Sequence, residues 1–131
     1  HLSDRRQRQM CIRDRSIIGR FLEHGRIYVF ANSGEFQSSK NDVYISSADM
    51  MPRNLYTRVE AYVPLKNETV RSQILTQVIP ALINDTKNSW LLEQTGEYVK
   101  LEDKLNFCSH SYFMENPSLS GQGTLSNSKT A

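Results

Sequence analysis

The chain has 131 residues, of which 38% are hydrophobic and 23% charged, and this suits one globular domain with a modest core rather than two domains. The formal net charge is only +2, and no apolar run approaches the roughly 20 residues that a membrane span needs, so a transmembrane protein is not expected. No secretory signal is visible, so we expect Cys11 and Cys108 to be reduced thiols of a cytoplasmic protein, with peripheral attachment to a membrane left open.

Most of the positive charge excess lies in residues 1–14, which hold four of the 16 basic and two of the 14 acidic side chains. Such a run suggests binding to nucleic acid. However, residues 5–14 are what a common transposon adapter for sequencing libraries encodes in one reading frame, and we interpret residues 1–15 as a non-native segment. The remaining 12 basic and 12 acidic residues give no argument for a nucleic-acid partner. On this interpretation the chain is a fragment that lacks its upstream neighbour.

The first native stretch, residues 16–30, predicts a short helix, a turn and a strand. Apolar residues recur at helical spacing at Ile17, Ile18, Phe21 and Leu22. Gly25 then ends the helix, and residues 27–30 are typical of a strand that is covered on both faces. His24 would lie where the helix meets the strand, held rigidly beside a cleft.

Two further strands are expected. A polar loop over residues 31–42 leads to a strand at residues 43–47, and Pro52 prevents that strand from continuing. Residues 58–64 alternate polar and apolar side chains, which predicts a more exposed strand.

The second half of the chain predicts one long helix and three shorter elements. Asn67 is a suitable N-cap, and apolar residues then recur up to Ile83 as a stripe that packs on the sheet. Pro80 should kink or divide this helix. Residues 90–92 and 98–101 predict a hairpin, and the aromatic residues after residue 106 predict a last short helix. Residues 117–131 predict a disordered tail.

Two blocks of sequence resemble a known family. Residues 19–30, GRFLEHGRIYVF, and residues 43–55, VYISSADMMPRNL, resemble the last domain of the histidine-phosphorylating polyphosphate kinases, and residues 107–121 resemble the end of some members. That half of the enzyme is similar to phospholipase D. The resemblance implies an α/β, phospholipase D-like domain over residues 16–116, with a mixed β-sheet packed by helices.

The resemblance also implies a function. The whole enzyme would transfer the terminal phosphate of ATP reversibly to polyphosphate through a phosphohistidine that lies upstream of this fragment, so the fragment alone should be inactive. The implied partners are ATP or ADP, inorganic polyphosphate, the upstream domains and further copies in a homo-oligomer. The implied cofactor is Mg²⁺, bound by the upstream part.

His24 is the main candidate residue, since an imidazole can accept a phosphoryl group, donate a proton or bind phosphate as a cation. The resemblance implies that His24 contacts the nucleotide phosphates and does not form the covalent intermediate. Arg26 stands where the related lipases have lysine, and on a strand it would share a face with His24. Its guanidinium could bridge two phosphate oxygens, and an ordinary surface arginine fits equally well.

Ser47 and Asp49 follow the second strand, where polar groups can hold an anion or orient His24. Asp49 could fix the tautomer of the imidazole, as a triad carboxylate does. A turn stabilised by these side chains needs no ligand and is the simpler alternative. Arg53 could add a basic rim toward the polyanion. His110 is expected to be structural, and neither a zinc motif nor a P-loop is present in the sequence.

Two other functions stay open. One is a phospholipase D-like phosphodiesterase half, against which the arginine at position 26 and the SSAD sequence of residues 46–49 both argue. The other is a non-catalytic subdomain that binds polyanion or builds an oligomer interface.

Overall fold

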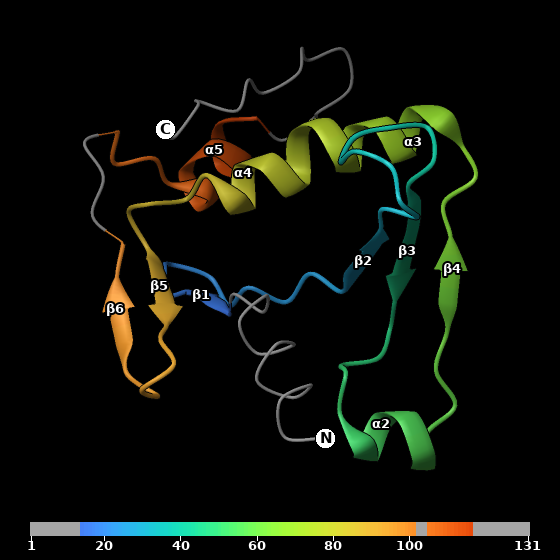
Figure 1. Ribbon diagram of the computed structural model, residues 1–131, viewed down its shortest axis with the longest axis horizontal. Helices are drawn as coiled ribbons and strands as arrows, with labels where there is room; N and C mark the ends of the chain where they lie inside the picture. The colour runs from blue at the N-terminus through green and yellow to red at the C-terminus, as the bar shows by residue number, and fades with distance from the viewer. Residues whose placement is uncertain (1–13, 102–104, 117–131) are drawn as a thin grey trace. The chain divides into compact units, whose positions relative to one another are not determined.

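The computed structural model describes residues 14–101 and 105–116 (Figure 1). The chain divides into two compact units. The terminal unit combines the residues up to Glu23 with Asn84–Asn116, and the described part of the site unit is His24–Ile83. The predictions of an adapter-derived segment and of a disordered tail fall almost wholly on residues 1–13 and 117–131, outside the described residues.

The terminal unit contains a three-stranded antiparallel sheet in the order β1-β5-β6. Its strands are β1 (Arg15–Ile17), β5 (Ser89–Leu92) and β6 (Tyr98–Lys100). The predicted hairpin is confirmed: Leu91 lies opposite Val99, and Gly96 in the turn has a φ of 88°, which favours glycine.

The predicted helix in residues 16–24 is wrong. Residues 15–17 form β1 and pair with β5, with Ser16 opposite Trp90. The amide of Ile18 continues this pairing by donating to the carbonyl of Asn88 at 2.9 Å. Hydrogen bonds to a strand some 70 residues away therefore override the helical spacing of the apolar residues, and Leu22 is 84% exposed.

The last helix, α5 (Ser109–Glu115), forms as predicted and is anchored by a buried aspartate. Asp85 and Ser109 are both fully buried. Oδ2 of Asp85 accepts hydrogen bonds from the amide of Ser109 at 2.8 Å and from its hydroxyl at 2.7 Å, and Oδ1 accepts from the amide of Asn88 at 2.8 Å. The carboxylate thus satisfies donors at the start of a helix, where the first amides lack partners within the helix.

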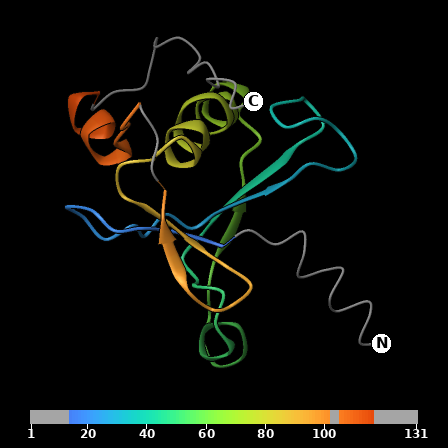
Figure 2. The ribbon, with the colours of Figure 1, turned by 60° about the vertical axis from the view of Figure 1, so that its left-hand side comes forward.

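The site unit contains a second antiparallel sheet, in the order β2-β3-β4. Strands β2 (Ile27–Phe30) and β3 (Asp42–Ser46) form as predicted, and β4 (Tyr62–Pro64) occupies the end of the predicted third strand. The expectation that β2 is covered on both faces is not met within the described residues, because Phe30 is 54% exposed. The β2–β3 loop projects beyond the strands (Figure 2).

Sheets and helices are both present, in line with the α/β prediction. The strand arrangement differs from the single mixed sheet that we expected, because every ladder among the described strands is antiparallel and the strands divide between two sheets. A short turn joins β5 to β6, which pair as a hairpin, whereas β1 and β5 pair although they are far apart in the sequence.

Helix α2 (Pro52–Thr57) joins β3 to β4 and was not predicted. Strand β3 already ends at Ser46, before Pro52, and Pro52 instead begins this helix. A proline is favoured in the first helical turn, because its fixed φ suits the helix and its missing N–H is not needed there.

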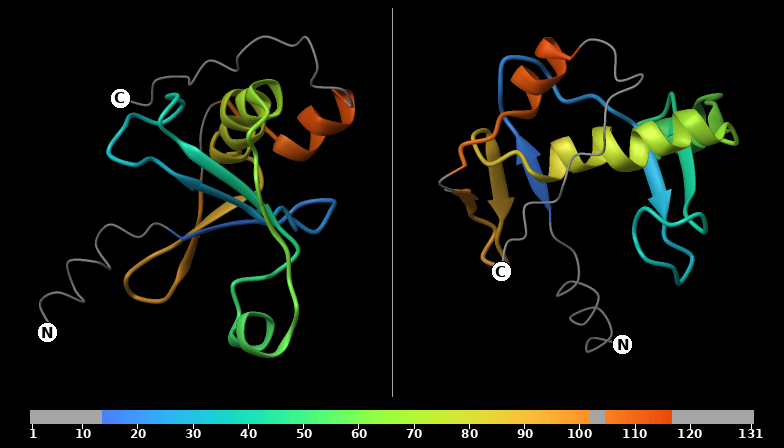
Figure 3. Two further views of the ribbon diagram at one scale, coloured as in Figure 1. Left: turned by 90° about the vertical axis from the view of Figure 1, so that its right-hand side faces the viewer. Right: turned by 90° about the horizontal axis from the view of Figure 1, so that it is seen from above.

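The long helix of the site unit has three parts, α3 (Glu68–Gln73), the π-helical segment η1 (Ile74–Val78) and α4 (Ile79–Ile83), which run on as one rod (Figure 3). The N-cap prediction is confirmed, since Oδ1 of Asn67 accepts from the amide of Val70 at 3.1 Å. The amide of Ile79 bonds to the carbonyl of Ile74, five residues back. Pro80 follows at once, and a wider turn accommodates a ring that would clash in an α-helix.

The apolar stripe of this helix is narrower than predicted. Leu75 and Ala81 are buried, whereas Val70 is 41% and Ile83 52% exposed. None of the helices in the described ranges combines the length and the apolar character that a membrane span needs.

Candidate functional site

The site unit brings three predicted residues together at one end of the β2–β3 pair. Ile27 lies opposite Ile45, and the amide of Ser46 donates to the carbonyl of Arg26 at 3.0 Å. In this antiparallel register, the residues that precede β2 lie beside the residues that follow β3. His24 and Arg26 therefore meet Asp49.

The three side chains form a hydrogen-bonded cluster, which we call the His24–Arg26–Asp49 cluster. Nε of Arg26 donates to Oδ1 of Asp49 at 2.7 Å, and Nη2 of Arg26 contacts Nε2 of His24. Nε2 of His24 lies 3.4 Å from the same Asp49 oxygen. Residues 24–26 precede β2 and are not part of the strand, but the side chains of His24 and Arg26 meet.

The cluster is open to solvent. The side chains of His24, Asp49 and Arg26 are 55%, 39% and 25% exposed. The imidazole is not turned into an apolar core, so a ligand in solution can reach it.

The arginine–carboxylate pair sets the charge of the cluster. The hydrogen bond from Arg26 lowers the pKa of the Asp49 carboxyl below its ordinary value, and the same bond raises the pKa of Arg26. Both groups are therefore charged at neutral pH, and their charges cancel. A proton on His24 would then give the cluster one net positive charge.

The protonation state of His24 decides its partner. Because Arg26 is always a donor, Nε2 can accept from Nη2 only when the imidazole is neutral and carries its proton on Nδ1. A doubly protonated ring repels the guanidinium and is drawn to the carboxylate oxygen 3.4 Å away. Arg26 can therefore hold the neutral ring and Asp49 the protonated ring.

Ser47 lies near Asp49 in the sequence, but its side chain bonds to Glu60 and not to the cluster. Its hydroxyl donates to Oε2 of Glu60 and accepts from the amide of Ala61 at 3.0 Å. The Ser47 hydroxyl thus ties the end of β3 to the approach to β4, and its contact with phosphate stays a prediction. Glu60 is a residue that sequence reasoning treated only as an exposed strand position, yet its charge contributes to the raised pKa of Arg26, after the contributions of Asp49.

Arg53 lies in the first turn of α2, exposed to solvent. Its carbonyl accepts a bond from the Thr57 hydroxyl, and no interaction of its guanidinium is found within residues 14–101 and 105–116. The structure does not bring Arg53 into hydrogen-bonding contact with the cluster. Its role as a basic rim therefore stays a prediction.

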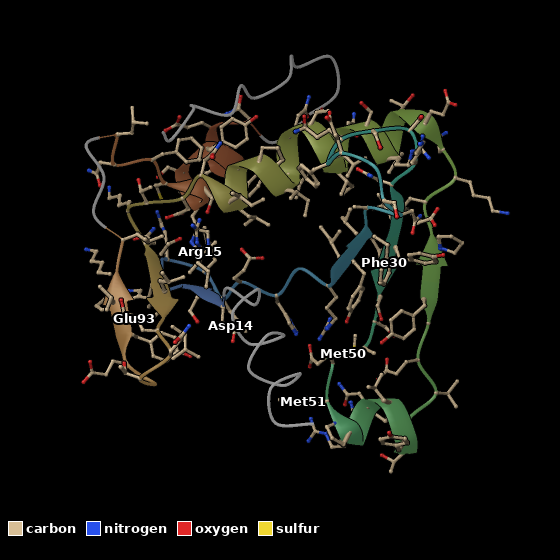
Figure 4. The ribbon with its side chains drawn as sticks, viewed as in Figure 1. Asp14, Arg15, Phe30, Met50, Met51 and Glu93 are labelled. Carbon is tan, nitrogen blue, oxygen red and sulfur yellow. The ribbon has the colours of Figure 1, made fainter. Side chains whose placement is uncertain are left out.

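Met50 and Met51 follow the cluster in the turn that leads into α2 (Figure 4). They are 64% and 53% exposed, although both are large and apolar. The carboxylate of Asp49 is thus followed directly by apolar surface.

A profile of one protein family matches residues 3–109, and that family is described as polyphosphate kinase C-terminal domain 2. The match covers most of the chain. The chain belongs to the polyphosphate kinase family. The resemblance carried by residues 19–30 and 43–55 is therefore confirmed. The match begins within the segment that we interpret as adapter-derived, so the domain boundary at residue 15 stays a prediction.

Individual polyphosphate kinases agree with this assignment. The chain is 53% identical to the polyphosphate kinase of Erythrobacter litoralis over 113 residues, which cover 86% of this chain and 16% of the relative. It is 39% identical over 100 residues to that of Xylella fastidiosa, covering 76% of this chain and 14% of the relative. The chain thus spans about a sixth of the length of these relatives.

A crystal structure of the polyphosphate kinase from Porphyromonas gingivalis has a similar fold. The TM-score is 0.70 at 25% sequence identity, over 80% of this chain and 16% of that one. The arrangement of strands and helices described above therefore occurs within a polyphosphate kinase.

His110 and Cys108 belong to the terminal unit and are not part of the His24–Arg26–Asp49 cluster. His110 is 6% exposed, its Nδ1 accepts from the amide of Phe21 at 3.4 Å, and its Nε2 lies 3.8 Å from Glu23. These contacts agree with the structural role that was expected. Cys108 is a free thiol whose sulfur accepts from Nδ2 of Asn88 at 3.2 Å.

The described residues form no cluster of several metal-ligating side chains. No group of three or more His, Cys, Asp or Glu side chains that could hold a metal ion is found among residues 14–101 and 105–116. In the cluster itself, the carboxylate of Asp49 is already engaged by Arg26.

Proposed function

We propose that this chain is the second C-terminal domain of a polyphosphate kinase that transfers the terminal phosphate of ATP reversibly to polyphosphate. The chain would supply one wall of the phosphoryl-transfer site, and the phosphohistidine would form on a residue upstream of it. The observation that carries the proposal is the solvent-exposed His24–Arg26–Asp49 cluster in a chain of this family.

His24 is suited to bind or protonate a phosphate oxygen. Its ring is exposed, and its Nε2 is held between Arg26 and Asp49, so its direction is fixed before a ligand arrives. Phosphoryl transfer depends mainly on positioned charge around the transferred group and its leaving oxygen. A protonated imidazole supplies such a charge without becoming the nucleophile.

Arg26 and Asp49 act together in this proposal. The Nε of Arg26 is committed to Asp49, which orients the guanidinium and leaves its Nη groups to face an anion. Phosphate would replace His24 as a partner of Nη2. The freed imidazole, once protonated, would pair with the same anion or with Asp49.

Magnesium, which a kinase of this type would use, is assigned to the upstream part of the enzyme, as the family resemblance implies. ATP or ADP, polyphosphate, the upstream domains and a second copy of the enzyme are the partners that the proposal includes.

Labelled ATP tests the proposal in the complete enzyme that carries this segment. We expect acid-labile label on the protein, as a phosphohistidine gives, followed by growth of polyphosphate chains. In His24→Gln, label should form more slowly but reach the same final amount, because His24 is not the nucleophile. Cleavage of phosphodiesters with no chain growth would instead indicate the phospholipase D-like function. Neither reaction, in a folded enzyme, would indicate a non-catalytic domain.

A further inference from the structure

Three side chains hold the backbone on both sides of Asp49. The Ser46 hydroxyl accepts from the amide of Ala48 at 2.9 Å, and the Tyr28 hydroxyl donates to the carbonyl of Ala48 at 3.3 Å. Nδ2 of Asn54 donates to the carbonyl of Asp49 at 3.4 Å. The Ala48 carbonyl belongs to the peptide plane before the Asp49 Cα, and the Asp49 carbonyl belongs to the plane after it.

Fixing both planes fixes the direction in which the Asp49 side chain leaves the backbone, because φ and ψ are the two soft torsions of a residue. We infer that Tyr28 and Asn54 are positioning residues, which hold these two planes so that the Asp49 carboxylate meets Arg26 and His24. This inference rests on the proposed function of the cluster.

Tyr28 and Asn54 come from elements outside the turn. Tyr28 lies on β2 and Asn54 on α2, whereas Ser46 is the last residue of β3 and directly precedes the turn that it stabilises. The turn would therefore form without them, as Ser and Asp turns commonly do. What they add is a fixed position relative to β2, the strand that Arg26 directly precedes.

The Tyr28 hydroxyl is suited to a permanent donor role. Loss of solvation on burial raises the pKa of the Tyr28 phenol above its ordinary value. The phenol therefore remains protonated at any pH at which the enzyme would work. Its ring is also held, 5.6 Å from the ring of Tyr62.

Asn54 is a buried amide whose hydrogen-bonding capacity is only partly used within the described residues. It is 3% exposed, and its Oδ1 is buried with no hydrogen-bond partner in the described part of the chain. A buried amide with an unpaired oxygen is unfavourable, and an isosteric apolar side chain avoids that cost.

A matched pair of hydroxyl deletions tests the role of Tyr28 in the complete kinase. Tyr44 lies directly opposite Tyr28 on β3, and its hydroxyl has no hydrogen bond in the described ranges. Tyr28→Phe should lower kcat/KM for ATP by about tenfold, since small misplacements of catalytic groups cost one to two orders of magnitude. Tyr44→Phe should stay within about twofold of wild type, since no bond is lost.

A double-mutant cycle then shows whether Tyr28 acts through Asp49. Asp49→Asn should reduce kcat/KM more than Tyr28→Phe does, and the double variant should match Asp49→Asn alone. Losses that multiply in the double variant, or wild-type kcat/KM in Tyr28→Phe, would overturn the inference while leaving the proposed function intact. Wild-type kcat/KM in Asp49→Asn would overturn the proposed role of the cluster itself.

Asn54→Leu separates positioning from stability. The leucine removes the unpaired amide, so the unfolding temperature of the kinase should stay the same or rise, while kcat/KM should fall by about tenfold. A variant that keeps wild-type kcat/KM would show that Asn54 does not position Asp49.

Discussion

Replacing Asp85 with alanine should strongly destabilise the terminal unit. The carboxylate accepts three hydrogen bonds of 2.7–2.8 Å, two of them from Ser109, and both Asp85 and Ser109 are fully buried. Each buried donor left without a partner costs about 1–3 kcal/mol, so the two donors of Ser109 predict a loss of about 2–6 kcal/mol. The third donor, the amide of Asn88, is not counted, because this residue is only half-buried and water can replace the lost carboxylate.

Urea unfolding of the 131-residue chain, followed by tryptophan fluorescence, measures this loss. Trp90 is the one tryptophan in the sequence and lies on β5 of the same unit. For an m-value of about 2 kcal/mol per M, a loss of about 4 kcal/mol lowers the midpoint by about 2 M. Ser109→Ala removes one donor instead of the acceptor and should cost only about 1 kcal/mol, which keeps the test usable if Asp85→Ala does not fold.

Asp42→Asn is the matched control. Asp42 is exposed and accepts one side-chain bond, from Asn32 at 2.7 Å, so its replacement should change the free energy of unfolding by less than about 0.5 kcal/mol. If Asp85→Ala were as mild as this control, the buried hydrogen bonds would not hold α5 in place and the reasoning would fail.

Three further outcomes are expected. Asn67→Ala should lower the free energy of unfolding by about 1 kcal/mol, because it removes the N-cap of α3. Asn67→Ser should retain most of the stabilisation that the cap provides, so equal unfolding curves for the two variants would contradict the cap. Leu75→Ala, at a side chain that is 4% exposed, should cost about 2–5 kcal/mol, and a loss under 1 kcal/mol would show that the helix does not bury it. Arg26 lowers the pKa of Asp49 in the folded chain, so the ionised carboxylate stabilises the fold. This contribution to the free energy of unfolding is complete above the ordinary carboxyl pKa and is lost as the pH falls through the lowered value. Asp49→Asn should remove this acid-side loss in unfolding curves measured at several pH values, and an unchanged pH profile would exclude the pair as its source.

The elements that local sequence determines could be predicted. Residues 27–30 and 43–46 form strands because their β-branched and aromatic side chains suit a sheet, and Asn67 caps its helix through a bond within one turn. The interruption at Pro80 follows from the chemistry of proline, although the π-helical form that it takes does not follow from the sequence alone.

Elements that depend on distant partners could not be predicted. Strand β1 has the apolar spacing of a helix and is a strand only because β5 pairs with it. Helix α2 was missed for a different reason, since Pro52 was taken only as the end of a strand, although it also suits the first turn of a helix. Nothing in the local pattern marks Asp85 as buried.

The candidate site was partly predictable. The two strands were predicted, whereas the antiparallel register that places His24 and Arg26 beside Asp49 was not. The sequence does not predict which side chain bonds to Asp49. Nε of Arg26 lies 2.7 Å from the Asp49 carboxylate oxygen, and Nε2 of His24 lies farther from it, at 3.4 Å. The bond from Ser47 to Glu60 likewise depends on where the residues before β4 return to the sheet.

The central claim is that the His24 imidazole binds or protonates phosphate during transfer, and the turnover of His24→Ala in the complete kinase tests it most directly. Loss of a general acid or of a positioned charge predicts a fall in kcat for polyphosphate synthesis of about 100-fold or more, with the unfolding temperature unchanged because the ring is 55% exposed. Wild-type turnover in a folded His24→Ala enzyme would contradict the account.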